Sequence, residues 1–245
     1  MSPDPIGDVI LAMDAARAEL PPHDGIGVFI DVYRRVTEQV RLRVADGLFT
    51  DPRFVEHLDV VFAQIFLEVP QSVAAGRSVN PSWQPLADAR GRDDLQPIQF
   101  ALAGMNAHIN HDLALAVVRA CSDRGVSPHR AGIHDDYEKV NEVLAEVVRP
   151  IRQSFLDANV VAAGRPLSPL ADLVSNFSID KARDAAWVSA LTLWEIRDVA
   201  FLERSLKQML SRTVGLISRQ LLVSFRDPLE HTQPFSEAQL ADGLG

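Results

Sequence analysis

The stretch Gly104-Met-Asn-Ala-His-Ile-Asn-His-Asp-Leu113 is the most informative part of the sequence, together with the Ala-Leu-Ala-Val-Val that follows it. At about 100° of rotation per residue, the apolar residues around it fall into one sector of a helix. They are Ile98, Leu102, Met105, Ile109, Leu113, Ala116 and Ala120. The second half of the stretch is apolar nearly all round, which is typical of a helix covered on most sides by others. The pattern predicts a central, buried helix over residues 95–121.

Helical spacing also dominates the rest of the chain, whereas the strict alternation of strands is scarce. Residues 76–94 are rich in Gly, Pro and charge and predict a loop with a short helix near Trp83. We expect an all-α, single-domain irregular bundle of about seven or eight helices over residues 1–228, and a loosely ordered tail over 229–245. The further expected helical segments are 5–20, 26–45, 51–69, 127–158, 167–177 and 178–225.

The composition excludes several classes of partner and location. The chain has 245 residues and a formal net charge of −9. This charge disfavours nucleic acid and anionic membrane as partners, because both require basic patches. Cys121 is the one cysteine, so no intramolecular disulfide can form. The sequence shows neither a signal peptide nor an apolar run of about 20 residues, and we expect a cytoplasmic protein.

Polar residues border the apolar sector of the central helix. Asn106 and Asn110 lie on one flank, and His108 and Asp112, four residues apart, lie on the other, while His111 is expected to point away from the core. Neighbouring helices carry polar residues at the edges of their own apolar faces. Because buried polar groups must find partners, the pattern predicts that seven residues converge between three helices: Asp59, Asn106, His108, Asn110, Asp112, Asp136 and Asn141.

Three interpretations of this cluster remain open. It can be a structural hydrogen-bond network that fixes the register of the helices. It can line a pocket in which Asp59, His108, Asp112 or Asp136 transfers protons to a small molecule. It can also hold a divalent metal, since His108 and Asp112 can share one ion from successive turns of a helix, with Asp59 or Asp136 completing the site.

Residues on the last predicted helical segment offer further candidates. Trp187 and Trp194 are seven residues apart, which places them on one helical face. They can belong to the core or form the wall of a pocket. Arg183, Arg197 and Asp198 can bind an anion or pair with one another.

The leading functional hypothesis is an enzyme of the lyase, isomerase or cyclase type, acting on a small, largely apolar molecule in secondary metabolism. Proton transfer is assigned to the Asp and His candidates, and substrate binding to Asn106, Asn110, Asn141, Trp187 and Trp194. The partner is a small-molecule substrate and no cofactor is expected. The alternatives are a metal-dependent hydrolase or oxygenase that uses the same cluster, and a non-catalytic ligand-binding or scaffold protein. An oligomer is possible, but the sequence does not indicate one.

The order of several motifs resembles that of a family of bacterial helical proteins, common in actinobacteria, whose domain has no known function. The motifs are Phe49-Thr-Asp-Pro52, Leu58-Asp-Val-Val-Phe-Ala63, Gly104-Met-Asn-Ala-His-Ile-Asn110 with Asp112-Leu113, Asp136 with Asn141, and Ser178-Ile with Ala182-Arg183 and Ala186-Trp187. The resemblance covers most of the chain. It implies a shared helical fold and implies no activity.

Overall fold

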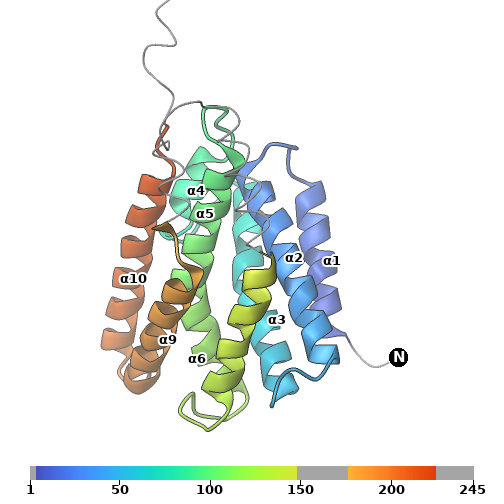
Figure 1. Ribbon diagram of the computed structural model, residues 1–245. Coiled ribbons are helices and arrows are strands. Elements are labelled where there is room, and N and C mark those ends of the chain that lie inside the picture. Colours follow the sequence, from blue (N-terminus) through green and yellow to red (C-terminus); the bar gives the residue numbers. More distant parts are fainter. Residues whose placement is uncertain (1–3, 148–175, 225–245) are drawn as a thin grey trace, which may run out of the picture.

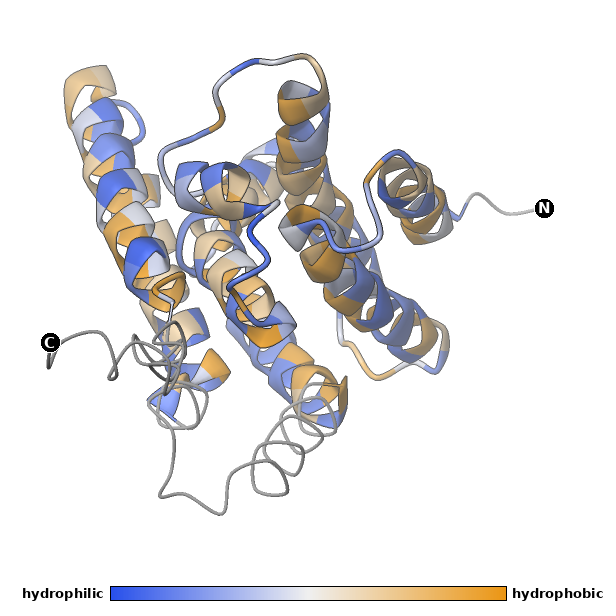
Figure 2. Cartoon of the chain, turned by 90° about the horizontal axis from the view of Figure 1, so that it is seen from above, coloured by the Kyte–Doolittle hydropathy of each residue, from blue (hydrophilic) through white to orange (hydrophobic). Residues whose placement is uncertain are grey.

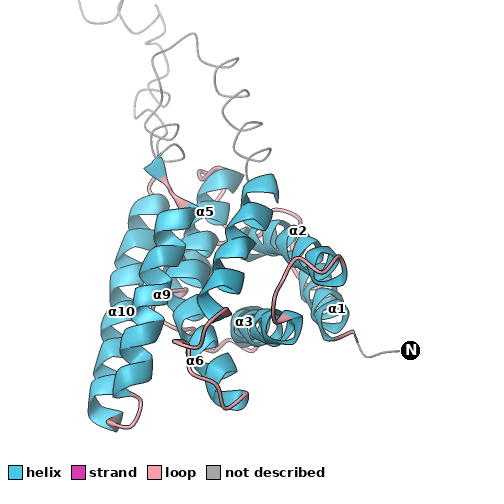
Figure 3. Ribbon diagram, turned by 60° about the horizontal axis from the view of Figure 1, so that its bottom comes forward, coloured by secondary structure: helices cyan, strands magenta, loops and turns pink. Residues whose placement is uncertain are grey.

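The computed structural model describes residues 4–147 and 176–224, and every regular element in these two ranges is a helix (Figure 3). The expected all-α fold is therefore confirmed. The elements are α1 (Pro5–Ala18), α2 (Gly25–Ala45), α3 (Pro52–Ala74), α4 (Gln84–Ala89), α5 (Pro97–Ala107), η1 (His108–Asp112), α6 (Leu113–Asp123), residues 133–147 (called helix 133–147), α9 (Ile179–Ile196) and α10 (Ala200–Leu221).

A long continuous helix made of α5, η1 and α6 runs through the middle of the bundle (Figure 1). On one side α2 packs against α5, and α3 packs against α6. On the other side α10 packs against α5, and α9 packs against α6. Helix α1 covers the outer side of α2 and α3. Ten consecutive residues of the central helix, from 98 to 107, are buried, which confirms its predicted place.

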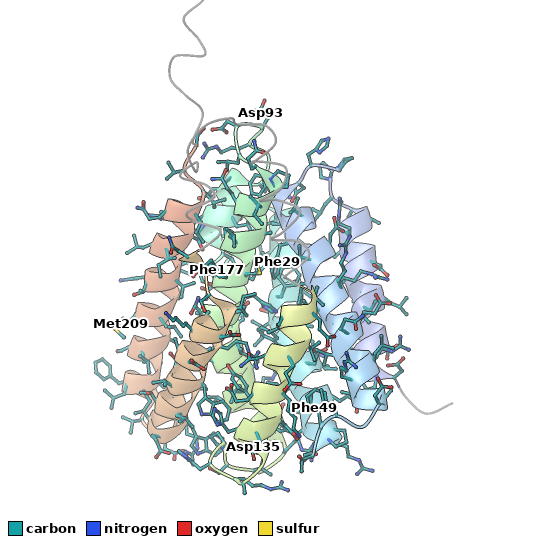
Figure 4. All side chains as sticks on the ribbon, in the orientation of Figure 1. Phe29, Phe49, Asp93, Asp135, Phe177 and Met209 are labelled. Atoms are coloured by element: carbon teal, nitrogen blue, oxygen red, sulfur yellow. The ribbon has the colours of Figure 1, made fainter. Side chains whose placement is uncertain are left out.

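The remaining helices bury one face and expose the other. Hydrophobic and hydrophilic residues alternate in patches along them (Figure 2), as expected of amphipathic helices around a core. Figure 4 shows Phe29 inside the bundle and Met209 on the outer side of α10. Among the described helices, none combines the length and the apolar character that a membrane span needs.

Side-chain caps set the starts of α1, α2, α3 and α9. The carboxylate of Asp51 accepts a hydrogen bond from the amide of Phe54, directly before Pro52 at the first position of α3. The hydroxyl of Ser178 accepts one from the amide of Lys181 at the start of α9. Such caps satisfy amides that have no partner within the helix. The caps at Asp51 and Ser178 lie at the starts of the helical segments expected from residues 51 and 178.

The central helix contains a turn of π-helix that the sequence analysis did not anticipate. In η1 the amide of Leu113 donates to the carbonyl of His108, five residues back, instead of four. A wider turn rotates each residue by less than the 100° of an α-helix. The expectation that His111 points away from the core is wrong: its side chain is only 3% exposed, because α10 packs against η1 on this side.

A glycine lets the central helix approach α2 closely. A Cβ atom added to Gly104 would lie 2.4 Å from a ring carbon of Phe29 and 2.8 Å from its Cβ. Any larger residue would push the helices apart, because neither contact involves the flexible end of a side chain. This close approach brings η1, one turn further along, next to the aromatic residues of α2 and α3.

Some predicted boundaries are wrong. Helix α3 continues through Pro70 to Ala74, and the segment expected over 178–225 is two helices separated at residues 197–199. The helix expected from residue 127 begins at 133, after turns. The expected helix over 167–177 and the tail over 229–245 fall largely or wholly outside the described residues.

Candidate functional site

A cavity of about 70 Å³ lies between α2, α3, the central helix, helix 133–147 and α9. A single water needs roughly 10–15 Å³ of such space, so the cavity has room for a small molecule. Four of the lining residues carry polar side-chain groups: Tyr33, Asp59, His108 and Arg183. The other described lining residues are apolar: Phe29, Val32, Val36, Val40, Val55, Leu58, Phe62, Met105, Ile109, Leu113, Val140, Leu144 and Ile179.

Asp112 organises the wall of the cavity at η1, although it does not itself line the cavity. Its Oδ2 accepts hydrogen bonds from the indole of Trp83 at 2.9 Å and from Nδ1 of His108 at 3.2 Å. Its Oδ1 lies 2.7 Å from Nδ1 of His111. Burial opposes ionisation of this carboxyl, but the hydrogen bonds from the two histidines outweigh it and lower its pKa. Asp112 is therefore an ionised acceptor that fixes its neighbours.

His108 is held as a neutral imidazole in an aromatic cage. Its ring stacks on Phe62 with centroids 3.5 Å apart, and the ring of Tyr33 meets it edge-on at 4.3 Å. Burial lowers its pKa, although Asp112 opposes this effect. Because the Asp112 carboxylate can only accept, Nδ1 carries the proton and Nε2 is left as a base. Nε2 is buried and has no hydrogen-bond partner.

Asp59, which lies on α3, supplies an acid where His108 supplies a base. It is 8% exposed, and its Oδ2 has no hydrogen-bond partner. Burial raises the pKa of this carboxyl from 3.8 to about 7. A large fraction of Asp59 is therefore protonated near neutral pH and can donate a proton.

Tyr33 adds a neutral hydroxyl to the same wall. Its oxygen is buried and has no partner in the structure. Burial raises its pKa well above 10 and the nearby charge of Asp59 raises it further, although the neighbouring hydroxyl of Thr37 opposes this effect. The hydroxyl is therefore protonated at neutral pH and can donate a hydrogen bond.

Arg183 brings a positive charge to the cavity from the first turns of α9. It is 4% exposed, and its guanidinium lies 4.1 Å from the centre of the Tyr137 ring. Its Nη2 donates to the carbonyl of Tyr137, and the Tyr137 hydroxyl donates to the carbonyl of Arg183 at 2.7 Å. These bonds fasten α9 to helix 133–147. Nε of Arg183 is buried without a partner.

The structure brings together only part of the predicted cluster. Asp59 and His108 line the cavity, and Asp112 holds His108 from behind. Asp136 does not line the cavity: its carboxylate accepts from the amides of Thr50 and Asp51 and from Lys139. It therefore anchors the turn before α3, and its expected place beside the other carboxylates is wrong.

The three asparagines also face elsewhere. Asn106 donates to the carbonyl of Val214 and to the hydroxyl of Ser218, both on α10. Asn110 donates to Asn106, and Asn141 donates to Glu138 within helix 133–147. The expected role of these side chains in holding a substrate is not supported, because their amide groups bond within the scaffold and none of them lines the cavity.

The two predicted tryptophans lie outside the cavity wall as well. Trp187 packs against His134 and Tyr137, with ring centroids 4.6 and 4.8 Å away. The guanidinium of Arg197 lies over the ring of Trp194, 4.2 Å from the ring centre. Their seven-residue spacing places them on one side of α9, which Arg183 shares, but neither of them lines the cavity.

Three residues of the site were missed by the sequence analysis. Tyr33 lies in the helix expected over residues 26–45, and its hydroxyl was the available signal. His111 was misplaced because α10 covers the side of the central helix that was expected to face away from the core. Trp83 gave no signal, since its partner Asp112 lies 29 residues away in the sequence.

The metal alternative gains no support from the arrangement. Across residues 4–147 and 176–224, no group of three or more His, Cys, Asp or Glu side chains is placed to hold a metal ion. Within the predicted pair, His108 directs Nδ1 at Asp112, and both oxygens of Asp112 already accept hydrogen bonds.

Comparison with known proteins gives a family and nothing closer. No curated protein and no solved structure matches the chain. The model of a family of unknown function (DUF5995) matches residues 6–224, which include all the residues of the cavity wall named above. This match covers most of the chain and agrees with the helical family expected from the motifs. The chain therefore belongs to the family of unknown function DUF5995.

Proposed function

We propose that the protein is an enzyme that moves a proton between two positions of a small, largely apolar molecule, as isomerases, lyases and some cyclases do. One observation carries the proposal: a protonated carboxyl and an unprotonated imidazole nitrogen, neither with a partner, line one apolar cavity. Groups whose surroundings drive their pKa values in opposite directions are suited to the roles of acid and base.

The reaction follows from the protonation states. Nε2 of His108 takes a proton from a carbon of the substrate next to a carbonyl group, and Asp59 gives its proton to another atom of the substrate. The substrate is thereby isomerised without net loss or gain of atoms. The imidazolium of His108 then returns a proton to Asp59, directly or through water. Asp112 acts as a positioning residue, because its carboxylate stabilises the imidazolium while that ion exists.

A purely structural network explains the site less well. Such networks satisfy their members, and each buried polar atom without a partner costs about 1–3 kcal/mol. Here the hydroxyl of Tyr33, Oδ2 of Asp59 and Nε2 of His108 are all buried without a partner. A bound molecule with its own polar groups would satisfy them. A cytoplasmic location remains part of the proposal and fits the free thiol of Cys121.

The test is proton exchange in heavy water. Small β,γ-unsaturated ketones and β,γ-unsaturated carboxylic acids are incubated with the protein in D₂O, and deuterium uptake and double-bond migration are followed by mass spectrometry and NMR. We expect uptake with the wild type and a loss of roughly 100-fold or more in Asp59→Asn and in His108→Gln. Asp136→Asn is the matched control, since it removes a buried carboxylate outside the cavity.

Two results would overturn the proposal. One is uptake that is equally fast in both cavity variants and in the wild type. The other is a panel member that binds in the cavity but exchanges no proton, which would make the protein a non-catalytic binder.

A further inference from the structure

The cavity contains a positive charge that the proposed proton transfer does not use. Arg183 is almost fully buried, lines the cavity and leaves its Nε without a partner. Glu138, Asp180 and Asp184 act on its charge only from a distance. Among the residues that the structure describes, no carboxylate forms an ion pair with it.

A buried arginine without a counterion is costly. Removing a charge from water carries a penalty of several kcal/mol unless an opposite charge or several hydrogen bonds compensate it. Arg183 has one hydrogen bond from Nη2 to Tyr137 and the face of the Tyr137 ring. Its remaining donors are open to a ligand, and a guanidinium presents them in a planar fork that matches a carboxylate.

From these contacts we infer that the ligand of the cavity is an apolar monocarboxylate whose carboxylate binds Arg183. The inference rests on the proposed function for the position of the reacting group, which faces His108 and Asp59 while the carboxylate lies at α9. The aliphatic and aromatic side chains of α2, α3 and helix 133–147 contact the body of the molecule.

The charges in the cavity favour one negative charge on the ligand. Arg183 is the one Lys or Arg among the described lining residues, and His108 is neutral. A phosphate, which carries up to two charges and three acceptor oxygens, would leave acceptors unsatisfied in an apolar wall. A second negative charge would also lie in the same cavity as the carboxyl of Asp59, which is partly ionised at neutral pH.

The experiment measures binding and needs no turnover. Hexanoate and phenylacetate, with hexanamide and phenylacetamide as neutral counterparts, are titrated into the full-length protein by calorimetry. We expect the carboxylates to bind roughly 10- to 100-fold more tightly than the amides, the range for hydrogen bonds to a charged group. Arg183→Met should remove this preference.

Arg197→Met is the matched control. Arg197 directly follows the last residue of the same helix and stacks on an aromatic ring at 4.2 Å, as Arg183 does at 4.1 Å, but its side chain is 40% exposed and does not line the cavity. Its variant should bind hexanoate as the wild type does. If Arg183→Met does not fold, Arg183→Lys and the comparison of acid with amide on the wild type replace it.

Equal affinity of acid and amide for the wild type would overturn the inference, as would wild-type binding of hexanoate by a folded Arg183→Met, or no binding of either carboxylate. The proposed function fails separately. β,γ-Unsaturated carboxylic acids that bind through Arg183 but exchange no proton would overturn that function alone, whereas turnover of neutral ketones without carboxylate binding would overturn this inference alone.

Discussion

Replacing Asp59 with asparagine should make the protein more stable at alkaline pH and should remove one source of its pH dependence. The Asp59 carboxyl has a pKa of about 7 in the folded protein, against 3.8 for an ordinary aspartate. The folded state therefore holds this proton more tightly than the unfolded state. Such a group favours folding most below pH 3.8, and that contribution is lost as the pH rises to about 7.

The magnitude follows from the two pKa values. A difference of about 3 units corresponds to about 4 kcal/mol of folding free energy lost above pH 7. About 1 kcal/mol of this is already lost near pH 4.5, so the wild type should weaken by about 3 kcal/mol relative to the variant between about pH 4.5 and about pH 8.

The assay is urea unfolding of the wild type and of Asp59→Asn at these two pH values, followed by tryptophan fluorescence. Asp136→Asn is the control whose effect should not depend on pH in this range. Burial opposes ionisation of Asp136, but the amides of Asp51 and Thr50 and the amine of Lys139 outweigh it and lower its pKa. The stabilisation that Asp136 provides is therefore present above pH 3.8 and is lost only at lower pH, so this variant should lose about the same stability at both pH values. If the free energies of unfolding of the wild type and of Asp59→Asn differ by the same amount at both pH values, the reasoning is refuted.

Three further predictions concern the scaffold of the site. Trp83→Phe should lower the free energy of unfolding by about 1.5–3 kcal/mol, because it removes a hydrogen bond to the buried charge of Asp112; unchanged stability in urea would contradict this role. Gly104→Ala should cost about 1–3 kcal/mol, because its Cβ meets Phe29 at 2.4 Å; a thermal midpoint equal to that of the wild type would show that the helices separate freely. Cys121 should react with a thiol reagent only as fast as the protein unfolds, because burial raises its pKa to about 11; fast labelling of the folded protein would contradict its burial.

Much of the fold could be predicted because it depends on local patterns. The period of apolar residues indicated the central helix, and Asp51-Pro52 and Ser178 marked helix starts that the structure confirms. The expected end of α3 at residue 69, just before Pro70, was wrong because a proline removes one hydrogen bond but does not always end a helix. The π-turn of η1 could not be predicted, since no residue type specifies it.

The direct side-chain contacts of the site were predicted only where one helix supplied both partners. His108 and Asp112 are four residues apart on the central helix, and their contact followed from that spacing. Asp136 was misassigned because the amides it binds lie 85 and 86 residues away in the sequence. Burial of Asp59 could be inferred from its apolar neighbours, whereas its lack of a partner depends on three-dimensional packing that the sequence does not reveal.

The central claim is that His108 presents a neutral nitrogen base to the cavity, and nitrogen NMR of its imidazole tests this directly. Long-range proton–nitrogen spectra of uniformly ¹⁵N-labelled protein, assigned with His108→Gln, distinguish a protonated ring nitrogen from an unprotonated one. At pH 7 we expect a protonated Nδ1 bonded to Asp112 and an unprotonated Nε2. An imidazolium at this pH, or a neutral ring with its proton on Nε2, would contradict the account.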